Sequence, residues 1–207
     1  RFVIAVFITL GKLQIAVQVQ PEPGLAVRDH DALIRRGARK HDAVRTLVEP
    51  AEPIRQTADA GAHPGRGMTG VLEPPRRLQR EDDRTTFASG APELDTWIRE
   101  FAFQNQKAHN SVTYVTVRDG VVLGYYALAM SAYSRDSAPE GLKKGRPQEI
   151  PCLLLARLAV DSRAKGRGVG AALLRDAIER SFQLSERVGA AALLIHCRDA
   201  EARSFYL

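Results

Sequence analysis

The sequence predicts an α/β (α+β) fold in which helices flank a mixed central sheet. Runs of β-branched and aromatic residues lie on both sides of Asp119-Gly120, a pattern typical of an antiparallel hairpin. Further on, the apolar runs "PCLLLARLAV" and "AAALLIHC" enclose a segment with helical periodicity. Two strands joined by a helix are expected to be parallel neighbours with a right-handed crossover. A hairpin and a parallel pair together predict a mixed sheet.

Composition limits the classes of protein to consider. The 207 residues suffice for one ordinary domain and an additional segment, and 44% hydrophobic with 26% charged residues predict a soluble globule. The net charge of +6 favours an anionic partner, such as nucleic acid or a phosphorylated cofactor. Cys152 and Cys197 are too few for a disulfide framework, and no Cys/His pair has metal-ligand spacing. We therefore expect no metal, and a reducing, cytoplasmic location.

The character of the sequence changes at Met68. Before it, the apolar residues 1–10 are too few to span a bilayer, and "IAVQVQPEPG" resembles an edge strand ended by prolines more than a signal peptide. A helix at 31–48 and a linker at 58–67 are predicted. We expect residues 1–67 to be an N-terminal extension or upstream non-native sequence, and residues 68–207 to form the domain.

The elements after Met68 follow from local patterns. Ser89 is a candidate N-cap, with Glu93 one turn later. A helix is expected next, because Leu94, Trp97, Ile98, Phe101 and Ala102 recur at helical spacing. After the hairpin, residues 135–150 are predicted to form a polar loop. An amphipathic helix at 168–189 presents one apolar face, made of Leu173, Leu174, Ala177, Ile178 and Phe182, and a last helix opens at 199–207.

A glycine-rich turn separates the strand at 151–160 from the amphipathic helix. Gly166, Gly168 and Gly170 occur there at every second position, beside the basic residues Arg163, Lys165 and Arg167. The start of a helix offers unpaired N–H groups and partial positive charge, and glycine lets a phosphate approach them closely. The turn is therefore a candidate pyrophosphate cradle, with a ligand-free glycine turn as the alternative.

Three phosphate-binding motifs compete for this turn. A P-loop requires G-x-x-x-x-G-K-S/T, and "GRGVGAALL" lacks the lysine and the hydroxyl. The dinucleotide pattern G-x-G-x-x-A matches formally, but a mostly polar segment, Asp161 to Lys165, precedes the glycines. The second strand also ends in Cys197-Arg198, where this pattern expects an acidic residue. The acyl-coenzyme A loop of GNAT acetyltransferases, Q/R-x-x-G-x-G/A, fits Lys165 to Gly170, with lysine in place of the usual first residue.

Residues 80–207 resemble the GNAT-fold toxins of bacterial type II toxin–antitoxin systems. Four blocks in the expected order carry the resemblance. They are "GVVLGYYALA", "LLARLAVDSRAKGRGVGAALL", "DAEARSFY" and a first block made of Phe87, Ser89, Gly90, Leu94, Asp95, Trp97, Ile98, Arg99 and Ala102, followed by "FQNQ".

The resemblance implies an acetyl-CoA-dependent N-acetyltransferase that blocks translation by acetylating the amino group of aminoacyl-tRNA. Tyr206 would be the general acid, and Arg99, Lys143, Lys144 and Arg163 are candidate tRNA contacts. The implied partners are aminoacyl-tRNA and a ribbon–helix–helix antitoxin, with a homodimer as a further option and no membrane. Acetyl-CoA would be held by Leu158, Ala159, Val160, Lys165, Gly166, Arg167, Gly168, Val169, Gly170 and Ala171.

Other functions stay open at this point. The acceptor could be a protein N-terminus or a small amine, or the chain could be a catalytically degenerate module that binds antitoxin or RNA. Members of the family continue after the F-Y block with the rest of a helix and two strands, whereas this chain ends at Leu207. We therefore expect the C-terminal strands to be missing and the packing at the C-terminal end of the domain to be incomplete. Whether the chain is active in this form stays an open question.

Several residues have competing structural roles. Tyr206 could be a core aromatic beside Phe205, and His196, within an apolar strand, is better explained as an interior histidine than as a base. Trp97 is predicted to lie in the core, and His109 on the surface. A further set of basic residues could together form a surface that faces the tRNA, although each residue alone is better explained as a solvated surface charge. The set comprises Arg76, Arg77, Arg80, Arg84, Lys107, Lys143, Lys144 and Arg146.

Overall fold

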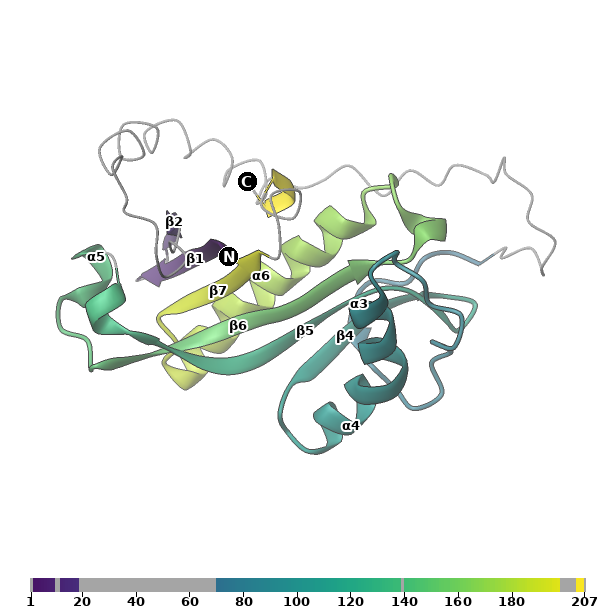
Figure 1. The fold of residues 1–207 in the computed structure, drawn as a ribbon, viewed down its shortest axis with the longest axis horizontal. Coiled ribbons are helices and arrows are strands. Elements are labelled where there is room, and N and C mark those ends of the chain that lie inside the picture. Colours follow the sequence, from purple (N-terminus) through teal and green to yellow (C-terminus); the bar gives the residue numbers. More distant parts are fainter. Residues whose placement is uncertain (1, 10–11, 19–69, 139, 198–203, 207) are drawn as a thin grey trace. The chain divides into compact units, whose positions relative to one another are not determined.

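The computed structural model describes residues 2–9, 12–18, 70–138, 140–197 and 204–206 (Figure 1). The chain divides into two compact units. Unit 1 comprises Arg1–Glu49, Met130–Leu155 and Ile178–Leu207, and unit 2 comprises Pro50–Ala129 and Ala156–Ala177. The predicted helix at 31–48, the linker at 58–67 and, within the predicted last helix, residues 199–203 and 207 lie outside the described residues.

The strands of unit 2 follow the order β6-β5-β4-β3, and the last residues of β5 and the first residues of β6 belong to unit 1. The β4–β5 hairpin is antiparallel and turns at Asp119 and Gly120, whose φ angles of 50° and 77° are both positive. Positive φ at both central residues is the requirement of the tight turn that Asp-Gly predicts, so the hairpin is confirmed. The strand bounds are β3 (Arg76–Arg77), β4 (Val112–Arg118), β5 (Val121–Ser134) and β6 (Glu149–Val160).

A continuous helical segment packs on the sheet of unit 2. The predicted burial of Trp97 is confirmed: it is 8% exposed, and its ring stacks on Tyr125 with centroids 5.6 Å apart. The hydroxyl of Tyr125 donates to the carbonyl of Leu94 at 2.8 Å, which fixes the helix against the strand. The segment consists of α3 (Pro92–Thr96), the π-helical turn η2 (Trp97–Phe101) and α4 (Ala102–Lys107).

The prediction that Ser89 caps this helix is wrong. Ala91 is the N-cap residue, and Pro92 begins the helix, where its fixed φ suits the first turn and its missing N–H costs nothing. Ser89 is buried, and its hydroxyl donates to the carboxylate of Asp95 at 2.6 Å while its amide donates to the same oxygen at 2.8 Å. The hydroxyl therefore ties the approaching chain to the helix instead of capping it.

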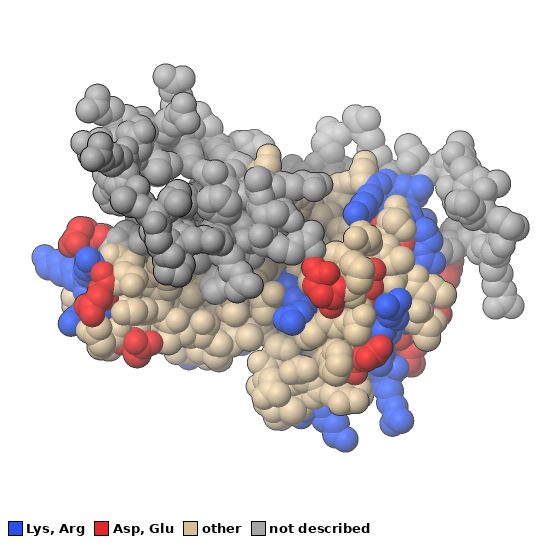
Figure 2. Space-filling view, in the orientation of Figure 1, with Lys and Arg blue, Asp and Glu red and all other residues tan. Residues whose placement is uncertain are grey.

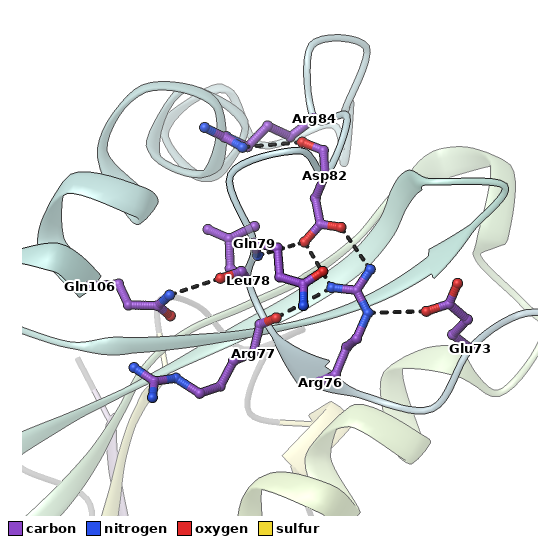
Figure 3. A network of polar contacts seen from close by, with 8 residues as sticks. All are labelled: Glu73, Arg76, Arg77, Leu78, Gln79, Asp82, Arg84 and Gln106. Carbon is purple, nitrogen blue, oxygen red and sulfur yellow. Dashed lines mark hydrogen bonds and ion pairs between the residues drawn. The ribbon is translucent and has the colours of Figure 1, made fainter.

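A polar network holds the segment before the helix (Figure 3). The Arg76 guanidinium donates to both carboxylate oxygens of Asp82, at 2.9 and 2.7 Å, and to Glu73 at 3.1 Å. Arg84 donates to the carbonyl of Asp82 at 3.1 Å, and the Gln106 amide donates to the carbonyl of Leu78 at 2.8 Å. Arg76 and Arg84, which the sequence offered for a tRNA surface, thus serve contacts within the protein.

Unit 1 contains strands in the order β2-β1-β7-β6. β7 (Ala192–Cys197) pairs in parallel with β6, which confirms the predicted parallel pair. β1 (Phe2–Thr9) lies antiparallel between β7 and β2 (Lys12–Gln18), and β2 is the edge strand expected near that position. The predicted polar loop at 135–150 holds two short helices, η3 (Arg135–Ser137) and α5 (Glu140–Lys143), and its last residues already belong to β6.

The long helix α6 (Val169–Val188) begins in unit 2 and ends in unit 1. It confirms the amphipathic pattern, because Leu173, Leu174, Ala177 and Ile178 are buried, while Phe182 is half-buried. No helix among the described residues combines the length and the apolar character that a membrane crossing requires.

Candidate functional site

The connection from β6 to α6 contains the glycine turn. A short 3-10 turn, η4 (Ser162–Ala164), follows the strand, and then Gly166 and Gly168 adopt φ angles of 72° and 78°. Glycine takes this left-handed conformation without steric cost. A Cβ atom at either glycine would meet nothing within 4 Å, so the surface of the turn is open. Backbone conformation and access, rather than packing, explain these two glycines.

The first turn of α6 presents unused amides on this surface. The amide of Ala172 donates to the carbonyl of Gly168 at 3.0 Å and begins the helical ladder. The four preceding amides, from Gly168 to Ala171, therefore have no acceptor within the helix and carry its partial positive charge. Figure 2 shows lysine and arginine side chains gathered around the start of α6. The arrangement suits an anion such as a diphosphate.

The carboxylate of Asp161 fastens the loop that leads into this turn. It is 0% exposed and accepts hydrogen bonds from the amide of Ala88 at 3.0 Å and from the Arg163 guanidinium at 2.7 and 2.9 Å. Burial acts to raise the pKa of Asp161, but the hydrogen bonds from Arg163 and Ala88 outweigh it and hold that pKa below its usual value. The amide of Ser162 donates in turn to the carbonyl of Ala88 at 2.9 Å.

The four predicted tRNA contacts fall into two groups. Arg99 and Arg163 belong to unit 2, where both side chains contact the same short segment. Arg99 donates to the carbonyl of Phe87 at 3.2 Å, and Arg163 donates to the carbonyl of Thr86 at 3.5 Å. Lys143 and Lys144 belong to unit 1, where the Lys143 ammonium pairs with Glu140 at 2.8 Å and Lys144 is exposed. The ion pair with Asp161 gives Arg163 a structural function that its sequence pattern did not indicate.

The predicted cofactor strand has an open edge. Pairing between β6 and β7 is confined to Leu153–Leu155, so within the described chain β6 has a strand neighbour on one side only, β5, over Leu158–Val160. Ala159 is buried, while Leu158 and Val160 are half-buried. Backbone groups on such an edge can pair with an extended ligand that carries amides.

Gly124 on β5 brings α6 close to the sheet. A Cβ atom there would lie 2.9 Å from Cδ1 of Leu173 and 3.2 Å from Cγ1 of Val169. The first turns of α6 can therefore rest on β5 only because residue 124 has no side chain. The Tyr126 hydroxyl donates to the carboxylate of Asp176 and adds a second tie between β5 and α6. Sequence reasoning included this glycine in a motif without finding its packing function.

The structure gives less information on the other three residues singled out in the sequence, Tyr206, His196 and His109. Tyr206 lies in the helical turn 204–206 of unit 1, half-buried, with its ring 5.1 Å from that of Phe205, and its catalytic function stays a prediction. His196 belongs to β7, but its side chain lies outside the described residues. His109 is exposed, as predicted.

The family model described as "Acetyltransferase (GNAT) family" matches residues 76–207. The chain belongs to the GNAT acetyltransferase family. A curated relative, the tRNA-acetylating toxin of Mycobacterium tuberculosis (strain ATCC 25618 / H37Rv), is 44% identical over 133 residues, which are 64% of this chain and 80% of the relative. The predicted fold and enzyme class are confirmed by these matches.

Solved structures of the toxin AtaT are similar to this GNAT acetyltransferase. AtaT complexed with acetyl-methionyl-tRNAfMet has a TM-score of 0.61 and 26% identity, covering 66% of this chain and 84% of AtaT. AtaTR bound with AcCoA has a TM-score of 0.57 and 27% identity, with coverage of 65% and 82%. A mutant AtaT toxin bound to the C-terminus of the antitoxin AtaR has a TM-score of 0.56 and 25% identity, with coverage of 66% and 80%.

Acetyl-CoA is the acetyl donor of the family, and the residues present fit it. The unused amides of Gly168 to Ala171 match a diphosphate, the open edge at Leu158–Val160 matches an amide-bearing arm, and the left-handed glycines leave the approach unobstructed. Within the described residues, no three His, Cys, Asp or Glu side chains gather in a way that could hold a metal ion.

We predict that Asp161→Asn lowers the free energy of unfolding by about 2–3 kcal/mol at pH 7, because Arg163 loses its buried anionic partner. The pKa of Asp161 is depressed in the folded state, so its contribution is complete above the unfolded pKa of about 4 and is lost as the pH falls through the folded value. Urea unfolding of both proteins at several pH values measures this. A difference that stays constant down to pH 2, or is absent at pH 7, contradicts the assignment.

Gly124→Ala is expected to destabilise the protein by about 1–3 kcal/mol, since the methyl group must displace the packed side chains of Leu173 and Val169. Because the strain falls on the first turns of α6, acetyl-CoA affinity should fall as well. Gly145→Ala separates the two effects, because its Cβ would meet nothing within 4 Å while its φ is 72°. Any loss of stability in that variant comes from backbone conformation and not from packing, and its acetyl-CoA affinity should be unchanged. Calorimetry that finds unchanged affinity in a folded Gly124→Ala protein would refute the link between this packing and the cradle.

Proposed function

We propose that this acetyltransferase moves the acetyl group of acetyl-CoA to the amino group of aminoacyl-tRNA and thereby acts as a translation-blocking toxin. One observation carries the donor half of the proposal: the glycine turn joins the open edge of β6 to the unused amides at the start of α6. The acceptor half is supported by the relative named as a tRNA-acetylating toxin and by AtaT seen with acetyl-methionyl-tRNAfMet.

In this proposal the amides of Gly168 to Ala171 hold the diphosphate of acetyl-CoA, and Lys165 adds a positive charge beside them. Lysine meets a phosphate as a point charge and not through two parallel hydrogen bonds. Leu158, Ala159 and Val160 bind the pantetheine arm through backbone groups. The arm then ends in a thioester, which supplies the activated acetyl group.

The chain's own groups then assist the attack of the amine. A backbone amide of the Leu158–Val160 edge donates to the thioester carbonyl oxygen, where negative charge develops. The hydroxyl of Tyr206 supplies a proton to the departing thiolate. An α-amino group has a pKa of about 8, so a sizeable fraction is neutral near pH 7 and a strong base is unnecessary.

The partners follow from the same proposal. Arg77, Arg80 and Lys107 are exposed and could contact phosphates of the tRNA. An antitoxin would silence the enzyme, as the AtaT complex with the C-terminus of AtaR supports, and the sequence resemblance predicts the ribbon–helix–helix class. Because aminoacyl-tRNA is used in translation, the proposed reaction takes place in the cytoplasm. A homodimer stays a prediction from the sequence.

The decisive experiment incubates the full chain with radiolabelled acetyl-CoA and four acceptors: total charged tRNA, deacylated tRNA, a peptide with a free N-terminus, and spermidine. We expect label in charged tRNA only, and release of N-acetylated amino acids after mild alkaline hydrolysis. Label in the peptide or in spermidine instead identifies another acceptor. Acetyl-CoA binding with no transfer to any acceptor would indicate a degenerate module.

A matched pair of variants tests the cradle. Gly168 has φ near 78°, a conformation that Asn and Asp tolerate better than other side chains. Gly168→Asn should weaken acetyl-CoA binding modestly. Gly168→Asp, of the same size, should weaken it about tenfold further, because its charge opposes the diphosphate. Calorimetry measures the acetyl-CoA dissociation constant of each variant. Equal affinities would show that the diphosphate does not bind at this turn.

A further inference from the structure

Arg157 lies on β6 directly before the open edge at Leu158–Val160. Its side chain is half-buried, and the carbon at the centre of its guanidinium lies 4.7 Å from the centroid of the Trp97 ring. In the described part of the chain, this guanidinium makes no hydrogen bond or ion pair. Arg76 and Arg163 differ, because each donates to a carboxylate that is almost fully buried.

The ring beneath Arg157 is itself held rigidly. Trp97 stacks on Tyr125, and Tyr125 is fixed by its hydrogen bond to Leu94. A cation above an aromatic face is attracted by the ring, which orients the flat guanidinium without using its N–H groups. Five donors in a fixed plane therefore stay available, and a half-buried cation of this kind is well prepared to bind an anion.

The position of Arg157 along β6 points to the reacting end of the site. With the diphosphate at the start of α6 and the arm running back along Val160 to Leu158, the thioester ends beside the next residue, Arg157. Side chains alternate along a strand, so Arg157 shares a face with Ala159. Ala159 packs in the same core as Trp97, which places Arg157 on the face that α3 and η2 cover. An amine that attacks the thioester from this face would pass close to Arg157.

We propose that Arg157 binds the phosphodiester directly 5′ of the aminoacylated adenosine of the acceptor. This inference rests on the proposed function, because only a nucleic-acid acceptor supplies that group. The amine, the ester and the ribose of a charged 3′ end carry no negative charge, so its phosphodiesters are the anionic groups on offer. The phosphodiester nearest to the amine is the one that joins the last two nucleotides, and a guanidinium binds phosphate through two parallel hydrogen bonds.

The test compares two small acceptors that carry an amino acid which the wild-type chain accepts on tRNA. One is the aminoacyl ester of adenosine, which has no phosphate, and the other is the aminoacylated dinucleotide CpA. Arg157→Gln should lower kcat/KM on the dinucleotide about 10- to 100-fold and leave the adenosine ester within about twofold of wild type. Arg157→Lys should fall between, because it keeps the charge and loses the paired hydrogen bonds.

Controls separate binding of the phosphate from structural damage. Arg187→Gln removes an exposed arginine near the end of α6 and should change neither acceptor. Acetyl-CoA affinity and the thermal unfolding midpoint should be the same in Arg157→Gln and wild type. A measurement without any variant uses wild-type protein and charged tRNA with a neutral methylphosphonate at the same linkage. Its kcat/KM should fall by the same about 10- to 100-fold.

Equal losses on both small acceptors, no loss on either, or full activity on the methylphosphonate tRNA would overturn the proposal. If the wild type needs the whole tRNA and uses neither small acceptor, the methylphosphonate comparison alone decides. A wild-type chain that binds acetyl-CoA but acetylates no charged tRNA contradicts the proposed function, and the assignment of Arg157 then falls with it. The two failures are thus distinguishable.

Discussion

Asp161 directly follows β6, and its carboxylate has no access to solvent, so its hydrogen-bonding capacity must be satisfied by the protein. The amide of Ala88 and the guanidinium of Arg163 meet that requirement. These hydrogen bonds direct the chain out of the strand and through η4 into the glycine turn. Because the ionised Asp161 side chain is held rigidly, it fixes the position at which α6 begins. The position of the unused helix amides therefore depends on Asp161.

Two neighbouring features complete the placement of these amides. The absence of a side chain at Gly124 lets the first turns of α6 lie directly on β5, and the left-handed conformations of Gly166 and Gly168 turn the chain without covering its open side. The strand edge at Leu158–Val160 leads into the same turn. An anionic, extended ligand is therefore matched by charge at one end and by backbone hydrogen bonds along its length.

Local patterns allowed much of this fold to be predicted. Asp119-Gly120 indicates its turn because only a few residues tolerate positive φ, and the helix between two apolar runs indicates a parallel pair. The functions of Ser89 and Arg163 could not be read in this way. Arg163 suggested a nucleic-acid contact by its charge, yet it pairs with Asp161, whose carboxylate also binds an amide 73 residues away in the sequence. Such pairings depend on tertiary contacts that no local period records.

The most direct test of the cradle follows backbone amide resonances of the isotope-labelled full chain by NMR during titration with acetyl-CoA. Amides report local hydrogen bonding, so the account predicts the largest shift changes at Gly168 to Ala171 and along Leu158–Val160. Saturable binding with the largest changes elsewhere, and with these two segments unmoved, would contradict it.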